Sequence, residues 1–161
     1  MHDVFLQLGS NIGDRKKYLD EAVSLITFEL GLINNISKVY ESTPWGVEGQ
    51  QKYLNQILQI NYKFEPLDLL KSILDIESRM GRKRIEKWGE RVIDIDIIFF
   101  SNYIIENVDL CIPHRHMHQR NFVLVPLNDI ASDYIHPKYK ITVKELLYNC
   151  KDIESVYEYE L

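Results

Sequence analysis

The hydrophobic periodicity of this chain alternates between strand-like and helix-like segments in an order that few folds accommodate. A short apolar run near the start is typical of a buried strand, and apolar side chains then recur at helical spacing. Two alternating segments, a second amphipathic helix and an isoleucine-rich strand follow. The predicted elements are a strand at 3–8, a helix at 15–30, strands at 35–42 and 54–64, a helix at 65–80 and a strand within 90–100.

This order, β-α-β-β-α-β, predicts an α+β sandwich of the ferredoxin-like kind, a split βαβ arrangement with helices on one face of an antiparallel-rich sheet. Residues 102–107 (NYIIEN) are expected to form a hairpin partner of the last strand, and 142–150 a further helix. No repeat or linker-like tract interrupts the 161 residues, so a single domain spanning 1–161 is predicted.

The composition is that of a soluble globular protein, with 45% apolar and 27% charged residues. A net charge of −5 disfavours wholesale binding to nucleic acid or an anionic membrane, and the apolar runs are too short to span a bilayer. The N-terminus lacks the features of a signal peptide. Cys111 and Cys150 have neither metal-ligand spacing nor the density of a disulfide scaffold, so both are expected to be reduced in a cytoplasmic protein.

Two carboxylates interrupt the apolar sequence ERVIDIDIIFF. Asp94 and Asp96 are two residues apart, so a strand presents both on one face, while the isoleucines between and beside them point to the other. The pattern fits either a solvated strand face or a paired-carboxylate metal site. Cations just before the strand favour the second interpretation, because arginines and Mg²⁺-binding carboxylates together suit a polyphosphate. These cations are Arg82, Lys83, Arg84, Lys87 and Arg91.

Other candidates are ambiguous when taken singly. Trp88 could anchor a core or stack on a base, and Tyr53 and Phe122 are of a kind usually found in cores. Asn55 offers a donor and an acceptor that suit the edge of a heterocycle. The histidines at 114, 116 and 118 do not share one helical face, so contact of one of them with phosphate is favoured over a zinc site.

The segment LGSNIGDR follows the first strand and suggests a phosphate-binding loop. It lacks the GxxxxGK[ST] pattern, and no GxGxxG is present. A turn or helix cap formed by Asn11 or Asp14 is therefore the better interpretation.

Together these motifs resemble the family of 6-hydroxymethyl-7,8-dihydropterin pyrophosphokinases. The match runs from residue 5 to about 131, and its WGxRxxDxDI and PHxxMxxRxFxLxPL patterns are the most specific. The resemblance implies a ferredoxin-like fold and, in folate biosynthesis, transfer of pyrophosphate from ATP to the pterin hydroxymethyl group with release of AMP. The matching segments are LGSNIGDR, YESTPWG, YLNQ, ESRMGRKR with KWGERVIDIDII, and PHRHMHQRNFVLVPLNDIA.

The resemblance also implies roles for individual residues. Two Mg²⁺ ions would be held by Asp94 and Asp96. The implied catalytic residues are Arg82, Arg84, Arg91, Asp94 and Asp96. The implied ATP-binding residues are Glu77, Trp88, Ile97, His114 and Arg120. The implied pterin-binding residues are Ser42, Thr43, Trp45, Tyr53, Asn55 and Phe122.

The expected partners are ATP and the hydroxymethyl-dihydropterin, with no nucleic acid or membrane, and the chain is expected to be a monomer. The alternative from another class is a non-catalytic ferredoxin-like RNA-binding domain, whose sheet would stack bases on exposed aromatic side chains. The net charge of −5 and the lack of an RNP1-like pattern argue against it. Phosphotransfer to another alcohol is a second alternative, which the match on the pterin side disfavours.

Overall fold

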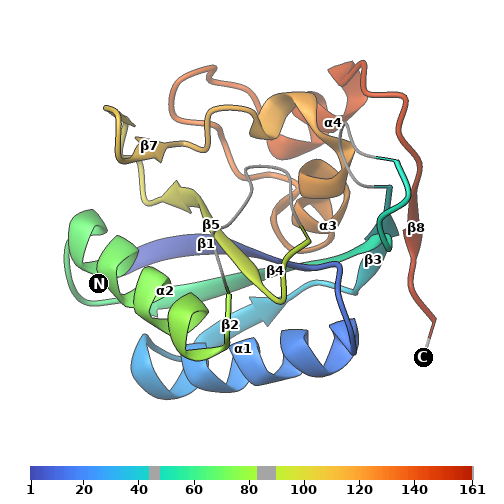
Figure 1. Ribbon diagram of the computed structural model, residues 1–161. Helices are drawn as coiled ribbons and strands as arrows, with labels where there is room; N and C mark the ends of the chain where they lie inside the picture. The colour runs from blue at the N-terminus through green and yellow to red at the C-terminus, as the bar shows by residue number, and fades with distance from the viewer. Residues whose placement is uncertain (44–47, 83–89, 161) are drawn as a thin grey trace.

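The computed structural model describes residues 1–43, 48–82 and 90–160. It contains a six-stranded antiparallel sheet in which β1 and β4 are interior neighbours and β2 also pairs with β4 (Figure 1). Along the main path the strands are ordered β5-β1-β4-β3-β8. Its strands are β1 (His2–Ser10), β2 (Ile33–Ile36), β3 (Tyr40–Ser42), β4 (Tyr53–Tyr62), β5 (Asp94–Phe100) and β8 (Val156–Glu158). This arrangement confirms the predicted ferredoxin-like α+β class.

Helices cover both faces of the sheet. α1 (Arg15–Glu29) and α2 (Pro66–Arg79) lie on one face, and α3 (Asn121–Ala131) and α4 (Val143–Asn149) on the other (Figure 1). The expectation that helices cover only one face was therefore wrong. The second layer forms because apolar side chains also point to that side, and they pack with α3 and α4 in a core of their own. Its sheet residues include Phe5, Ile57, Ile98 and Phe99.

The first helical layer forms as the sequence predicts. The carboxylate of Asp14 accepts a hydrogen bond from the Lys17 N–H at 3.2 Å, which caps α1. α2 begins at Pro66, where the missing N–H costs nothing, and Asp68 accepts from the Glu65 N–H at 3.3 Å. The isoleucines of the DIDID strand also behave as expected, because Ile93, Ile95 and Ile97 are buried in the core beneath α1 and α2.

The segment predicted as one strand at 35–42 is divided into β2 and β3. Ser37 lies between them, buried, and its Oγ accepts a hydrogen bond from the Ile57 N–H at 2.9 Å. The Ser37 N–H still donates to the Ile57 carbonyl at 2.9 Å, but the return bond goes to the side chain of Ser37 in place of its carbonyl, and the ladder is interrupted there.

Two short pairings differ from the prediction or were not predicted. Within 102–107, β6 (Ile105–Glu106) pairs with β7 (Cys111–Ile112) in a separate two-stranded sheet, not with β5. β8 was not predicted, and it extends the main sheet by pairing with β3. A 3₁₀ turn at Met117–Gln119 precedes α3.

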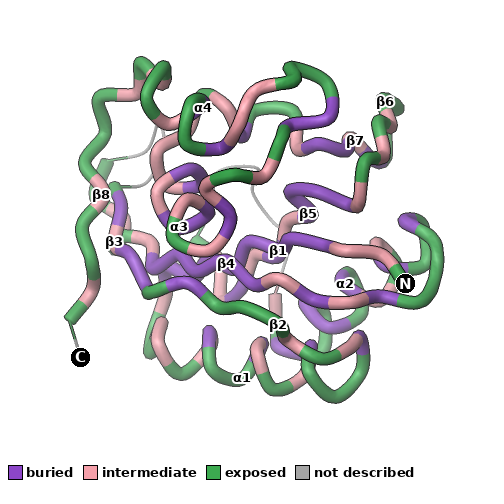
Figure 2. The backbone as a smooth tube through the Cα atoms, turned by 180° about the vertical axis from the view of Figure 1, so that it is seen from behind, coloured by how far each residue is buried: buried purple, intermediate pink, exposed green. Residues whose placement is uncertain are grey.

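Buried residues concentrate in the central strands, as Figure 2 shows. Among the described residues, no helix has both the length and the apolar character needed to cross a membrane.

Candidate functional site

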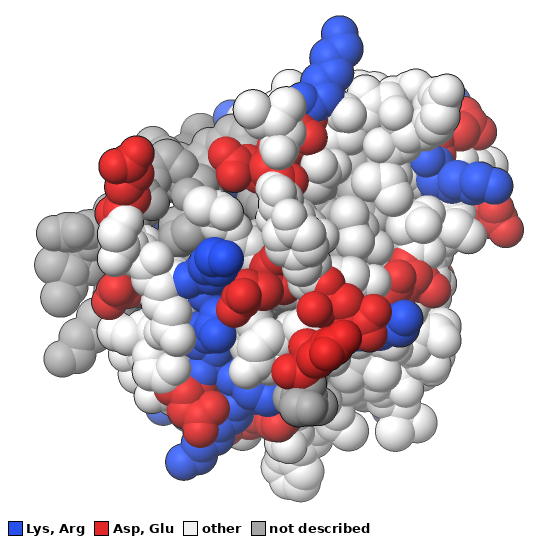
Figure 3. Space-filling view, turned by 90° about the vertical axis from the view of Figure 1, so that its right-hand side faces the viewer, with Lys and Arg blue, Asp and Glu red and all other residues white. Residues whose placement is uncertain are grey.

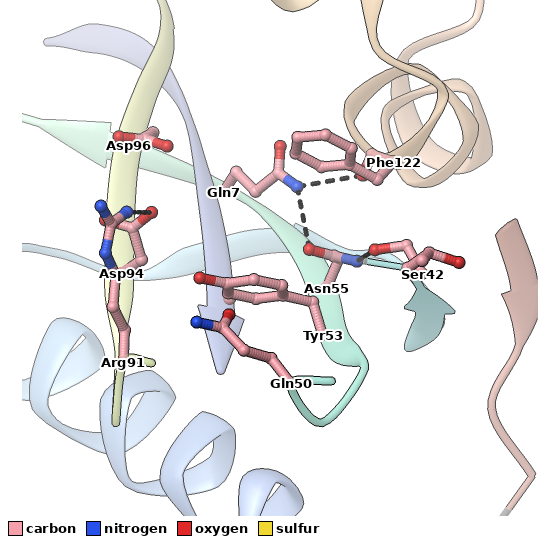
Figure 4. A pocket seen from close by; sticks show the side chains of 11 residues that line it. Gln7, Ser42, Gln50, Tyr53, Asn55, Arg91, Asp94, Asp96 and Phe122 are labelled. Atoms are coloured by element: carbon pink, nitrogen blue, oxygen red, sulfur yellow. Dashed lines mark hydrogen bonds and ion pairs between the residues drawn. The ribbon is translucent and has the colours of Figure 1, made fainter. Parts of the chain in front are cut away.

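A pocket opens on the α3 side of the sheet, over the ends of three adjacent strands (Figure 4). The pairing places Gly9 of β1 opposite both Asn55 of β4 and Asp94 of β5. Two residues along the strand, and so on the same face, Gln7 is opposite Asp96. Cross-strand partners point to the same face, so the polar side chains of three strands converge. The lining residues are Gln7, Gly9, Ser42, Thr43, Gln50, Tyr53, Asn55, Arg91, Asp94, Asp96 and Phe122.

The two aspartates have different surroundings. Asp94 is held by two guanidinium groups, with Arg82 Nη1 at 2.8 Å and Arg91 Nη1 at 3.1 Å from its carboxylate oxygens. Burial, followed by repulsion from the carboxylates of Asp94 and Glu77, raises the pKa of Asp96 well above its usual range. A cation beside Asp96 would favour its ionised form and relieve this repulsion.

Glu77 of α2 contacts β5, the strand that carries the two aspartates. Its side chain is 3% exposed, accepts a hydrogen bond from the Ile95 N–H at 2.9 Å, and forms an ion pair with Arg82. Burial raises the pKa of Glu77, and the charge of Arg82 opposes that rise. Because Arg82 also binds Asp94, Glu77 fixes both the backbone of β5 at Ile95 and the guanidinium of Arg82.

The polar wall of the pocket is a chain of hydrogen bonds. The Gln7 Nε2 group donates to the Phe122 carbonyl at 3.0 Å and, more weakly, to Asn55 Oδ1 at 3.5 Å. Asn55 Nδ2 in turn donates to Ser42 Oγ at 2.7 Å. Aromatic rings of Tyr53 and Phe122 also border the cavity (Figure 4). The pocket therefore combines flat apolar surfaces with directed polar groups, which suits a heterocycle.

A groove on the α2 side adjoins the pocket. Both cavities are lined by Arg91, Asp94 and Asp96, so these three residues form the junction between them. Further residues that line the groove are Leu67, Leu70, Lys71, Ile73, Leu74, Glu77, Arg82, Ile95, Asp109 and His114. Burial and the charge of Arg120 lower the pKa of His114 to about 4, so this imidazole is neutral at physiological pH.

Most described candidates from the sequence meet at these two cavities. Arg120 lies beside them, with its guanidinium carbon 5.6 Å from the centre of the Phe122 ring. Ile97 is the exception, because its side chain is 6% exposed in the core on the opposite face of β5. Ile97 could therefore contact a nucleotide only through its backbone. The candidates Trp45, Arg84 and Trp88 lie outside the described residues.

The histidine-rich segment does not gather its three imidazoles. The rings of His114 and His116 are 6.4 Å apart, whereas His118 packs against Tyr139 at 4.9 Å. Within the described part of the chain, no group of three or more His, Cys, Asp or Glu side chains is placed to hold a metal.

Three pocket residues escaped the sequence interpretation. Gln7 lies in a run that was interpreted only as a buried strand, although a lone amide in such a run is a signal. Gly9 leaves room beside Tyr53, because a Cβ there would lie 3.4 Å from that ring. Gln50 accepts a hydrogen bond from Asn11 Nδ2 at 3.1 Å, a contact between distant segments that no local pattern reveals.

The donor set fits a hard divalent cation. Asp94 and Asp96 supply carboxylate oxygens on one strand face, and Mg²⁺ is commonly bound by one or two carboxylates together with substrate phosphates.

Comparisons with known proteins show which family the chain belongs to. The family model for 7,8-dihydro-6-hydroxymethylpterin-pyrophosphokinase matches residues 5–132. A pyrophosphokinase of that substrate from Aquifex aeolicus is 41% identical over 145 residues, which are 90% of each chain. The corresponding enzyme of Haemophilus influenzae is 38% identical over 158 residues, covering 97% of this chain and 98% of that one.

Solved structures show the same fold. A crystal structure of a two-enzyme chain, HPPK-DHPS in complex with substrates, superimposes with a TM-score of 0.76 at 19% identity. The match covers 91% of this chain but only 43% of that one, so this chain spans less than half the length of the two-enzyme protein.

The fold and the comparisons together define a diphosphotransferase. More specifically, the chain belongs to the 7,8-dihydro-6-hydroxymethylpterin-pyrophosphokinase family. The alternative of an RNA-binding domain is not favoured. On the molecular face in Figure 3, the acidic and basic side chains of the described residues are intermixed.

Proposed function

We propose that the chain transfers the pyrophosphoryl group of ATP to the hydroxymethyl oxygen of 6-hydroxymethyl-7,8-dihydropterin, releasing AMP, with the acceptor in the pocket and ATP in the groove. The observation that carries this proposal is the junction of the two cavities at Arg91, Asp94 and Asp96. A transfer reaction needs its donor and acceptor to meet where negative charge can be neutralised. Family membership supports the choice of substrates.

In this proposal the pterin ring lies between Tyr53 and Phe122, with its polar edge toward Asn55 and Ser42. The hydrogen bond from Asn55 Nδ2 to Ser42 Oγ preorganises both side chains before the substrate arrives. Thr43 lines the same pocket, and Trp45 is proposed to contact the pterin as well.

ATP is proposed to bind along the groove, with its phosphates near Arg82 and Arg91. Each guanidinium already binds Asp94, so each is held where phosphate oxygens would arrive. His114 lines the same groove. The proposed nucleotide contacts further include Glu77, Trp88, Ile97 through its backbone, and Arg120, and Arg84 is proposed to bind phosphate.

Two Mg²⁺ ions are the proposed cofactors, and Asp94 and Asp96 would hold them. When bound, Mg²⁺ would neutralise phosphate charge and lower the pKa of the attacking hydroxyl. The arginines of the chain would stabilise charge that develops as AMP leaves, and the pocket walls would orient the hydroxymethyl group toward the phosphates. No described side chain is nominated as a general base.

The test is release of AMP from ATP that depends on both Mg²⁺ and hydroxymethyl-dihydropterin. Asp96→Ala is expected to keep the fold and abolish this release, and Arg84→Ala to lower turnover at least about tenfold, or roughly 1.4 kcal/mol. Full activity of Asp96→Ala would refute the assignment of the carboxylates. Release of ADP in place of AMP would refute pyrophosphoryl transfer.

We further propose a cytoplasmic monomer that acts as a single domain over 1–161. β1 near one end of the chain and β8 near the other belong to the same sheet, which supports a single domain. Use of ATP and the two free cysteines fit a reducing compartment.

A further inference from the structure

The hydrogen-bond chain along the pocket wall has a fixed direction. The Phe122 carbonyl can only accept, so the Gln7 amide must turn its Nε2 group toward it, at 3.0 Å. The oxygen of the Asn55 amide faces that same Nε2 group at 3.5 Å, and the Asn55 nitrogen therefore faces Ser42. One backbone carbonyl thus determines the orientation of both amides.

This direction leaves the oxygen of Gln7 without a partner. Gln7 is 4% exposed, and its Oε1 atom has no hydrogen bond even though it is buried. Gln7 lines the pocket, and Figure 4 shows its oxygen turned away from Asn55. A buried amide oxygen without a donor destabilises a protein, and such groups are rare in folded chains. The bound ligand is the natural source of the missing donor.

The position of Gln7 sets what that donor can be. Gln7 is the cross-strand partner of Asp96, so it stands on the strand face that carries the carboxylates and lies between them and the Phe122 wall. A pterin in this pocket offers N–H groups on its ring and one O–H on its hydroxymethyl group. An acceptor that cannot be protonated selects such donors and disfavours a ligand that presents an acceptor there.

We propose that Gln7 is a specificity-determining residue for the pterin. Its Oε1 atom accepts a hydrogen bond from an N–H or O–H donor of the bound pterin, and its Nε2 group fixes Phe122 and Asn55 in their binding positions. This inference rests on the proposed function, since it assigns the pocket to the pterin.

Gln7→Leu tests the proposal, because leucine is similar in size and removes both the donor and the acceptor. The KM for the pterin is expected to rise about tenfold, with the KM for ATP unchanged. Gln7→Met, which is unbranched like glutamine, provides a second variant should leucine fail to fold. Calorimetric titration with the pterin alone measures its affinity without any dependence on catalysis.

Gln56 offers a matched control. It is also a buried glutamine of the sheet, donates to the Ser37 carbonyl at 3.0 Å, and has an unpartnered Oε1 atom, but it lines neither the pocket nor the groove. Gln56→Leu should therefore leave the affinity for the pterin unchanged.

The outcomes separate this inference from the proposed function. Weaker pterin binding in Gln7→Leu but not in Gln56→Leu supports the role of Gln7. Unchanged pterin affinity in both Gln7 variants, or an equal rise in the KM of both substrates, overturns it. If the wild type binds the pterin but releases no AMP, the proposed function fails while the calorimetric comparison still decides the role of Gln7.

Discussion

Asn11 and Arg91 are joined by two hydrogen bonds although 80 positions separate them. The Arg91 N–H donates to Asn11 Oδ1 at 2.7 Å, and the Asn11 N–H donates to the Arg91 carbonyl at 3.1 Å. Asn11 is fully buried and follows the end of β1 directly. The pair therefore connects Arg91, which lies just before β5, to the end of β1. It also fixes the backbone position from which the Arg91 side chain extends.

Asn11→Ala should lower activity by displacing Arg91. The change leaves the Arg91 N–H without its acceptor, which we expect to cost about 1–3 kcal/mol of unfolding free energy. Because Asn11 fixes the backbone of Arg91, its loss should also displace the Arg91 guanidinium that binds Asp94, and kcat should fall together with stability. Urea unfolding and steady-state kinetics measure the two effects.

Asp14→Ala is the control, because Asp14 only caps α1. It should cost about 1 kcal/mol and leave kcat unchanged. Equal kinetics in the two variants would contradict a positioning role for Asn11.

The C-terminal segment should contribute to pterin binding through Asp152. Its carboxylate accepts the Asn121 N–H at 2.9 Å at the start of α3, one residue before Phe122, and its carbonyl accepts from Asn121 Nδ2 at 2.9 Å. Asp152→Ala is expected to cost about 1 kcal/mol of stability, as loss of a helix cap does. The KM for the pterin should rise severalfold, with little change in the KM for ATP.

Glu154→Ala provides the comparison, since Glu154 contributes only its backbone N–H to Asp152, at 3.0 Å. Glu154→Ala should have the same unfolding free energy and the same KM for the pterin as the wild type. A pterin KM in Asp152→Ala equal to that of Glu154→Ala would show that the cap does not position Phe122.

The elements that local patterns determine were predictable, and those that depend on distant partners were not. α2 combines an apolar stripe with Pro66 at its start, both of which are local signals. β8 is three residues long and exists because β3 offers it an open edge. The division at Ser37 likewise depends on Ile57 across the sheet.

The same distinction applies to the site. Asp94 and Asp96 could be recognised from the sequence, because residues two apart in a strand lie on the same face. The two hydrogen bonds between Asn11 and Arg91 were not visible in the sequence, and Asn11 was interpreted only as a possible turn or cap. Its hydrogen bonds to Arg91 and Gln50 join three segments that are far apart in the sequence.

Mg²⁺ should stabilise the protein only when Asp96 is present. In the wild type, with a non-hydrolysable ATP analogue, Mg²⁺ at about 100 times its Kd is expected to add about 3 kcal/mol to the unfolding free energy. Asp96→Asn should lose this increment. Without Mg²⁺ this variant should be at least as stable as the wild type at pH 8, because it removes a half-buried carboxylate that is repelled by Asp94 and Glu77.

Thermal melts with and without EDTA measure both effects. Asp109→Asn is the control, since Asp109 also lines the groove but is exposed and is not part of β5. A full Mg²⁺ increment in Asp96→Asn would place the ion elsewhere.

Acid should destabilise the fold through His136. This side chain is 2% exposed, and its Nδ1 atom accepts hydrogen bonds from the backbone N–H groups of Lys138 and Tyr139, at 3.2 and 3.1 Å. Burial lowers the pKa of His136 from 6.5 to about 4, so the folded state keeps the imidazole neutral where the unfolded chain binds a proton. The contribution of His136 to the unfolding free energy is therefore fully present above pH 6.5. About 3 kcal/mol is lost as the pH falls toward 4.

His136→Asn should flatten this pH dependence, because the amide oxygen keeps an acceptor for the two N–H groups but does not titrate. Urea unfolding at pH 7 and pH 5 measures the slope. His114, whose pKa burial also lowers to about 4, loses stability over the same range, so the variant is expected to retain part of the dependence. A wild-type slope in His136→Asn would show that His136 is not responsible for the loss.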